Sequence, residues 1–189
     1  MDLKKASNLL LFGSKNCKEL EYPNCFVGSL SKLVKSDISL LKSMAQASKS
    51  ASLSANQIGS EHNMFVIRQK IKDNQWFYED KGYYSVFINP RICKVSQKIE
   101  ENWEYCASFP WLRAKVPRFL KIKVEYDDEG LNTREKVLEG FLARLFQHEL
   151  DHLRGLTLIN WRLNHLGLDF LDKEENEDNK EILQVLLTF

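Results

Sequence analysis

The strongest constraint on this chain is the segment Gln147–Gly155, which reads QHELDHLRG. In a helix, His148 and His152 project from the same face, one turn apart, and can share one metal ion. Glu149 between them can reach a water on that ion, which the ion acidifies and the carboxylate deprotonates. The pattern therefore predicts a helix with a catalytic metal site. The alternative for so short a motif is a pair of surface histidines on a charged helix.

A catalytic site of this kind needs a third protein ligand. Proteases that add a histidine three residues after the glycine are excluded, because Leu158 stands there. His62 and His165 lie in segments without a distinctive pattern, and the acidic run 174–181 is too polar to supply a buried ligand. Cys106 is the remaining candidate. The other three of the four cysteines form no Cys-x-x-Cys pair, and we expect them to be free thiols.

Hydrophobic periodicity predicts an α+β chain with antiparallel sheets. The predicted helices cover 29–48, with Leu33 in the apolar stripe, then 138–153, and at the end of the chain 182–189. The predicted strands cover 64–68, 83–89 and 91–100, and a hairpin is predicted from 120–126 and 131–137. We expect a loop over 49–60. We expect Pro90 to interrupt the strands and Gly155 to end the helix that carries the histidines. The length of 189 residues, without internal repeats, predicts one catalytic domain over 1–189.

Charge and hydropathy exclude several partners. A net charge of +1 provides no broad basic surface for nucleic acid or an anionic membrane. The best N-terminal apolar run, Leu9–Phe12, has four residues, which is too short for a membrane span or a secretory signal. We therefore expect an intracellular protein that binds neither nucleic acid nor membrane.

Three segments in order resemble the motifs of the peptide deformylase family, metalloenzymes that remove the formyl group from the N-terminal methionine of new proteins. The family patterns are GxGLAAxQIG, EGCLSxP and QHExDHLxG. The chain has SASLSANQIG at 50–59, EYCASFP at 104–110 and QHELDHLRG at 147–155. The resemblance spans about residues 30 to 163. It implies antiparallel sheets packed around a central, metal-binding HExxH helix.

The resemblance also implies a metal site. Cys106, His148 and His152 would bind one divalent ion, Fe(II) in cells and Zn(II), Ni(II) or Co(II) in isolated protein. Glu149 would be the general acid and base for attack of water on the formyl carbon and departure of the amine. The substrate would be an N-formylated nascent peptide, met at the ribosome, in a bacterial cytoplasm or an organelle.

Further roles follow for residues around the ion. Gln57 and the backbone N–H of Ala107 would stabilise the oxyanion. The expected substrate-contacting residues are Ser52, Tyr105, Phe141 and Leu145, and the alternative role of Phe141 and Leu145 is ordinary core packing. Glu104 and Arg118 would form a supporting ion pair, and the alternative is two separate surface charges.

The chain departs from the family pattern at the expected cleft. Ser50, Ser52 and Tyr105 replace glycines, while Ser54 and Ala107 replace an alanine and a leucine. Glycine in such loops often means positive φ or close backbone approach, so these changes predict an altered cleft. Three interpretations follow: a divergent deformylase, a related hydrolase for another formylated or acylated amine, and a metal-stabilised binding protein without turnover. The retained Glu149 and Gln57 count against the third, because neither is needed merely to hold a metal.

Overall fold

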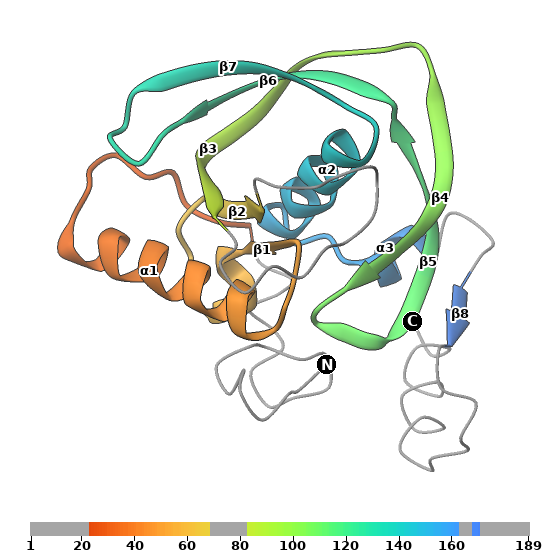
Figure 1. The fold of residues 1–189 in the computed structure, drawn as a ribbon, viewed down its shortest axis with the longest axis horizontal. Coiled ribbons are helices and arrows are strands. Elements are labelled where there is room, and N and C mark those ends of the chain that lie inside the picture. Colours follow the sequence, from red (N-terminus) through yellow and green to blue (C-terminus); the bar gives the residue numbers. More distant parts are fainter. Residues whose placement is uncertain (1–22, 69–82, 163–167, 171–189) are drawn as a thin grey trace.

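The computed structural model describes residues 23–68, 83–162 and 168–170 (Figure 1). The strands are β1 (Ser52–Ser54), β2 (Met64–Arg68), β3 (Tyr84–Val95), β4 (Ile99–Cys106), β5 (Phe109–Phe119), β6 (Lys121–Asp127), β7 (Thr133–Glu139) and β8 (Leu168–Phe170). The helices are α1 (Lys32–Ala47), the 3-10 helix η3 (Ala55–Ile58), α2 (Phe141–Leu153) and α3 (Leu158–Arg162). One sheet has the order β1-β2-β3-β6-β7 and the other β4-β5-β8. All these pairs are antiparallel, which confirms the predicted antiparallel sheets.

Helix α1 covers one face of the larger sheet. It begins where the Ser31 hydroxyl accepts a hydrogen bond from the Val34 N–H at 3.1 Å. Its buried side chains are Val34, Ile38, Leu41, Met44 and Ala45, which belong to one apolar cluster with residues of β1, β2 and β3. The predicted helix is confirmed. Leu33, expected in the stripe, is instead 63% exposed, since it lies about 100° around the helix from Val34.

Helix α2 packs against the opposite face of that sheet. The Phe146 ring meets Phe65 of β2 and Phe87 of β3 edge-to-face, with centroid separations of 5.0 and 5.5 Å. Helix α2 also contacts β5 of the smaller sheet, so both sheets touch this helix (Figure 1). Residues drawn from the two sheets can therefore meet its side chains.

The predicted start of this helix is wrong, while its predicted end is confirmed. Leu138 is a buried residue of β7, and α2 begins only at Phe141. Gly140 separates the two elements with φ of 60°, a conformation that favours glycine. At the other end, Gly155 has φ of 75° and follows the last helical turn.

The predicted loop over 49–60 is wrong. Ser52 pairs with Ile67 and Ser54 with Phe65, so the segment adds strand β1 to the edge of the larger sheet. Residues 51–57 are all buried. Small polar residues give no hydrophobic alternation, and the pairing that makes this segment a strand comes from β2, which follows later in the chain.

The predicted break at Pro90 is also wrong. Strand β3 continues through it, with a register shift between Ile88 and Arg91 and with Asn89 at φ of 50°. A bulge accommodates proline, which has no N–H to donate to a neighbouring strand. The predicted hairpin is confirmed by β6 and β7, whereas the β4–β5 hairpin was not predicted. The acidic run 174–181 and the closing helix over 182–189 lie outside the described residues.

Candidate active site

The structure brings together the three residues predicted as metal ligands. Cys106, His148 and His152 each offer one ligand atom, these atoms lie within 4.8 Å of one another, and all three residues are buried. Cys106 Sγ is 3.2 Å from His152 Nε2, and the two imidazole centroids are 4.9 Å apart. One thiolate and two imidazoles are a donor set suited to Fe(II) or Zn(II), so the group fits a divalent ion.

Two elements supply these ligands. His148 and His152 lie one turn apart on α2, and Cys106 is the last residue of β4, where the β4–β5 register shifts. Strand β5 pairs with β4 and also contacts α2, so Cys106 at the end of β4 lies beside the two histidines. Burial lowers the pKa of His152 well below its usual value, and the neighbouring His148 lowers it further. This direction favours the neutral imidazole, which is the form that binds a metal.

Glu104 supports the first ligand histidine. Its Oε2 is 2.9 Å from His148 Nδ1, a contact that directs the His148 Nε2 lone pair to a metal. Arg118 donates to both oxygens of Glu104, from Nε at 2.9 Å and from a terminal nitrogen at 3.0 Å. The predicted ion pair is confirmed. Burial would raise the pKa of Glu104, but His148 and Arg118 outweigh it and hold that pKa well below its usual range.

Two further charged residues complete this network, and the sequence did not reveal their roles. Arg144, one turn before the first ligand histidine, donates to Glu104 Oε1 at 2.9 Å and to backbone oxygens of β5 and β4 at 2.7 and 2.6 Å. Asp151 accepts a hydrogen bond from Arg118 at 2.5 Å. The available signal was an arginine four residues before the first histidine, on the face of the helix that carries the histidines.

Glu149 is 2% exposed and faces β1. Ser52 and Ser54 alternate with Leu53 along β1, so both hydroxyls lie on one face of the strand, the face that meets the Glu149 carboxylate. Its Oε2 has no hydrogen-bond partner among the described residues. Burial raises the pKa of Glu149, against opposition from His148 and the two serines. Such a carboxylate is suited to accepting a proton.

Gln57 of η3 is buried beside the cysteine. Its Nε2 donates to Ser108 Oγ at 3.0 Å and lies 3.6 Å from Cys106 Sγ. Its Oε1 accepts the Ser54 backbone N–H at 2.9 Å. The donor end of the amide therefore points toward the three clustered ligand residues.

The other predicted residues differ in exposure. Ala107 is partly buried against the apolar cluster that includes α1. Tyr105 is 58% exposed, and strand alternation places it on the opposite face of β4 from Glu104. Phe141 and Leu145 are half-buried on α2. Their predicted contacts with substrate stay predictions.

The residues that stand in place of the family's glycines have no strained backbone angles. Among the described non-glycine residues, positive φ occurs at Lys49, Asn89 and Leu131. Ser50, Ser52 and Tyr105 therefore adopt ordinary backbone angles, and any effect of these substitutions comes from their side chains.

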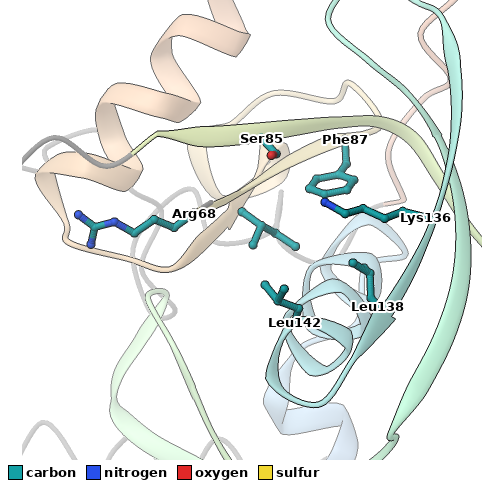
Figure 2. Close-up of a pocket in the computed structure, with 7 residues that line it drawn as sticks. Arg68, Ser85, Phe87, Lys136, Leu138 and Leu142 are labelled. Carbon is teal, nitrogen blue, oxygen red and sulfur yellow. The ribbon is translucent and has the colours of Figure 1, made fainter. Parts of the chain in front are cut away.

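A separate pocket lies between the larger sheet and the start of α2 (Figure 2). Its described lining comprises Ile67, Arg68, Ser85, Phe87, Lys136, Leu138 and Leu142. None of the predicted site residues is in that lining.

A sequence model described as polypeptide deformylase matches residues 15–167. The chain belongs to the polypeptide deformylase family. Peptide deformylase of Aquifex aeolicus is 37% identical over 147 residues, which are 76% of this chain and 83% of that protein. Peptide deformylase 2 of Nostoc sp. is 33% identical over 121 residues, 64% of this chain, and the chain spans 66% of the length of that relative. The crystal structure of peptide deformylase from Thermotoga maritima has a TM-score of 0.69 at 28% identity and covers 80% of this chain and 94% of that chain.

These deformylase matches confirm the predicted family and the predicted enzyme class, a peptide deformylase that hydrolyses the N-terminal formyl group. The deformylase-like fold, with antiparallel sheets and few helices, is likewise confirmed. Among the described residues, no helix is both long and apolar enough to span a bilayer.

Proposed function

We propose that this chain removes the N-formyl group from the N-terminal formylmethionine of new proteins, releasing formate, with a divalent metal ion held by Cys106, His148 and His152. The proposal rests on the buried cluster of Cys106, His148 and His152, together with buried Glu149, which lies on the same helix as the two histidines. In this proposal, residues 1–189 act as one catalytic domain and α2 is its central, metal-binding helix.

The donor set suits several ions. When bound, a divalent ion lowers the pKa of a coordinated water and polarises the formyl oxygen. We expect Fe(II) in cells, because thiolate and imidazole ligands suit it, and Zn(II), Ni(II) or Co(II) in isolated protein.

Glu149 performs the proton transfers. Its carboxylate takes a proton from the attacking water and passes it to the leaving amine, which is a poor leaving group unless protonated. The raised pKa and the Oε2 without a partner support this role.

Gln57 and Ala107 supply hydrogen-bond donors to the oxygen of the former carbonyl as its negative charge grows. The Gln57 side chain offers N–H groups at the cysteine, and the backbone of Ala107 adds another N–H directly after it. Each such donor contributes about 3–4 kcal/mol to transition-state stabilisation in hydrolases of known mechanism.

The substrate is an N-formylated nascent peptide, which the enzyme meets at the ribosome of a bacterial cell or an organelle. Ser52, Phe141 and Leu145 border the methionine, because they lie on α2, the helix that carries Glu149, and on β1, the strand that Glu149 faces. Tyr105 meets the following residues of the peptide, since it is exposed on β4, an edge strand of its sheet.

The deciding experiment measures formate release from formyl-Met-Ala by protein prepared anaerobically and loaded with Fe(II). Turnover supports the proposal. Full metal occupancy without turnover on this peptide would refute it. In that case, hydrolysis of another formylated or acylated amine would reassign the substrate, and inactivity on all such amines would indicate a binding protein.

A further inference from the structure

Ser54 lies beside Gln57 and Glu149, the two residues proposed to act in catalysis, and its fully buried hydroxyl contacts two amide side chains. Its Oγ lies 2.7 Å from Asn56 Oδ1 and 3.0 Å from Gln57 Oε1. Its backbone N–H donates to the same oxygen of Gln57 at 2.9 Å. Two donor groups of one residue therefore converge on Gln57 Oε1.

Together with Ser108 Oγ, which accepts a hydrogen bond from Gln57 Nε2 at 3.0 Å, these contacts decide which end of each amide faces the catalytic residues. An amide side chain has one acceptor end and one donor end. With both oxygens held at Ser54, Gln57 Nε2 lies 3.6 Å from Cys106 Sγ, and Asn56 Nδ2 donates to the His152 carbonyl at 2.6 Å. A rotated Gln57 would place its NH2 group against the Ser54 N–H, and burial makes such a donor–donor contact costly.

The hydroxyl is a feature of this chain, because the family pattern has alanine at this position. It also lies on the face of β1 that meets Glu149, together with Ser52. Ser54 thus touches both Gln57 and Glu149 from one strand position.

We infer that Ser54 is a positioning residue whose hydroxyl keeps the Gln57 amide turned with its N–H groups toward the reacting carbonyl. The inference rests on the proposed function, in which Gln57 stabilises the oxyanion. Donors fixed before the reaction need no reorganisation as the charge develops, so holding this amide in place increases the rate of the chemical step. The Ser54 N–H holds Gln57 Oε1 in every rotamer of the hydroxyl, and the single hydroxyl proton adds a second hydrogen bond to that oxygen when it is directed to Gln57.

The first test is Ser54→Ala. Alanine is the residue of the family pattern, so we expect the variant to fold and bind metal. We expect kcat to fall about fivefold, corresponding to about 1 kcal/mol for one neutral hydrogen bond, with KM unchanged. The matched control is Ser43→Ala, which removes an exposed hydroxyl that contacts only Leu40 O on α1 in the described hydrogen bonds, and should leave kcat unchanged. An unchanged kcat in Ser54→Ala would overturn the inference.

A double-mutant cycle with Gln57→Ala tests the route of the effect. If Ser54 acts through Gln57, the serine substitution should cause no further loss in the Gln57→Ala background. The same fivefold loss in both backgrounds would show that Ser54 acts elsewhere, and would contradict the inference.

A readout independent of turnover uses Zn(II)-loaded, 15N-labelled protein. The Gln57→Ala variant identifies the side-chain amide signals of Gln57. We expect these signals to be sharp and slow to exchange with solvent in the wild type, and broader and faster to exchange in Ser54→Ala. Identical signals in both would overturn the inference. If the wild type releases no formate, the proposed function fails, and this measurement still decides whether Ser54 holds the amide.

Discussion

Glu104 Oε2 accepts a hydrogen bond from His148 Nδ1 at 2.9 Å, so a carboxylate on β4 directs an imidazole on α2. The same carboxylate also binds two guanidinium groups, of Arg118 at 2.9 and 3.0 Å and of Arg144 at 2.9 Å. Glu104 thus joins the strand that carries the proposed cysteine ligand to the helix that carries the proposed histidine ligands.

Replacing Glu104 with alanine should strongly destabilise the protein. Arg118 would lose one of its carboxylate partners, and Arg144 would be left buried without the ion pair to Glu104. We expect a loss of about 3–5 kcal/mol in the free energy of unfolding, measured by urea denaturation. The control, Glu101→Ala, removes a 56% exposed carboxylate on the same strand and should cost less than about 1 kcal/mol. Equal losses in the two variants would contradict the role given to Glu104.

Replacing Arg144 with methionine should weaken metal binding. The change keeps an unbranched side chain but removes the hydrogen bonds to Glu104 and to the backbone oxygens of β4 and β5. We expect the dissociation constant for Zn(II), measured by competition with a chelator, to rise about 10- to 100-fold. Arg134→Met, at a 56% exposed position on β7, should leave it unchanged. An unaltered affinity in Arg144→Met would show that the ligand geometry does not depend on this arginine.

Glu149→Ala should separate metal binding from turnover. Glu149 is not among the clustered ligand atoms, so metal content should stay at the wild-type level. Loss of the general acid and base should lower kcat about 10²- to 10⁴-fold, measured by formate release. Glu139→Ala, which removes a 62% exposed carboxylate on β7, serves as the control. Persistent activity in Glu149→Ala would mean that another group is the base.

The β6–β7 turn should lose stability in acid. Hydrogen bonds from the Asn132 backbone, and then from Arg134, lower the pKa of Asp128 to about 2. Because the folded pKa lies below the unfolded value, Asp128 stabilises the fold above about pH 4, and this contribution is lost as the pH falls toward 2. The difference in unfolding free energy between wild type and Asp128→Asn should therefore be constant above about pH 5 and shrink in acid. A carboxyl 13C titration near the usual aspartate value would disprove the shift.

The hydrophobic pattern of the sequence was sufficient to predict a helix or strand where one face of that element is apolar. The stripe through Leu41 and Met44 predicted α1, and the alternation over 120–126 predicted β6. The spacing of His148 and His152 predicted that both histidines lie on one helical face, and α2 confirms it. The pattern failed at Ser52–Ser54 and at Pro90, where polar burial and a bulge depend on partners distant in sequence.

The sequence by itself determined the chemistry that this chain can perform: the residue types of a metal hydrolase, in an order typical of deformylases. Only the tertiary structure decided how the parts are held. It pairs Arg144 with Glu104 and directs the Gln57 amide oxygen to Ser54. It also places Tyr105 on the opposite face of β4 from Glu104. Ligand spacing within one helix is fixed by helix geometry, and so can be predicted from the sequence. Contacts between β4, η3 and α2 join residues 40 or more positions apart, and only packing of the whole chain determines them.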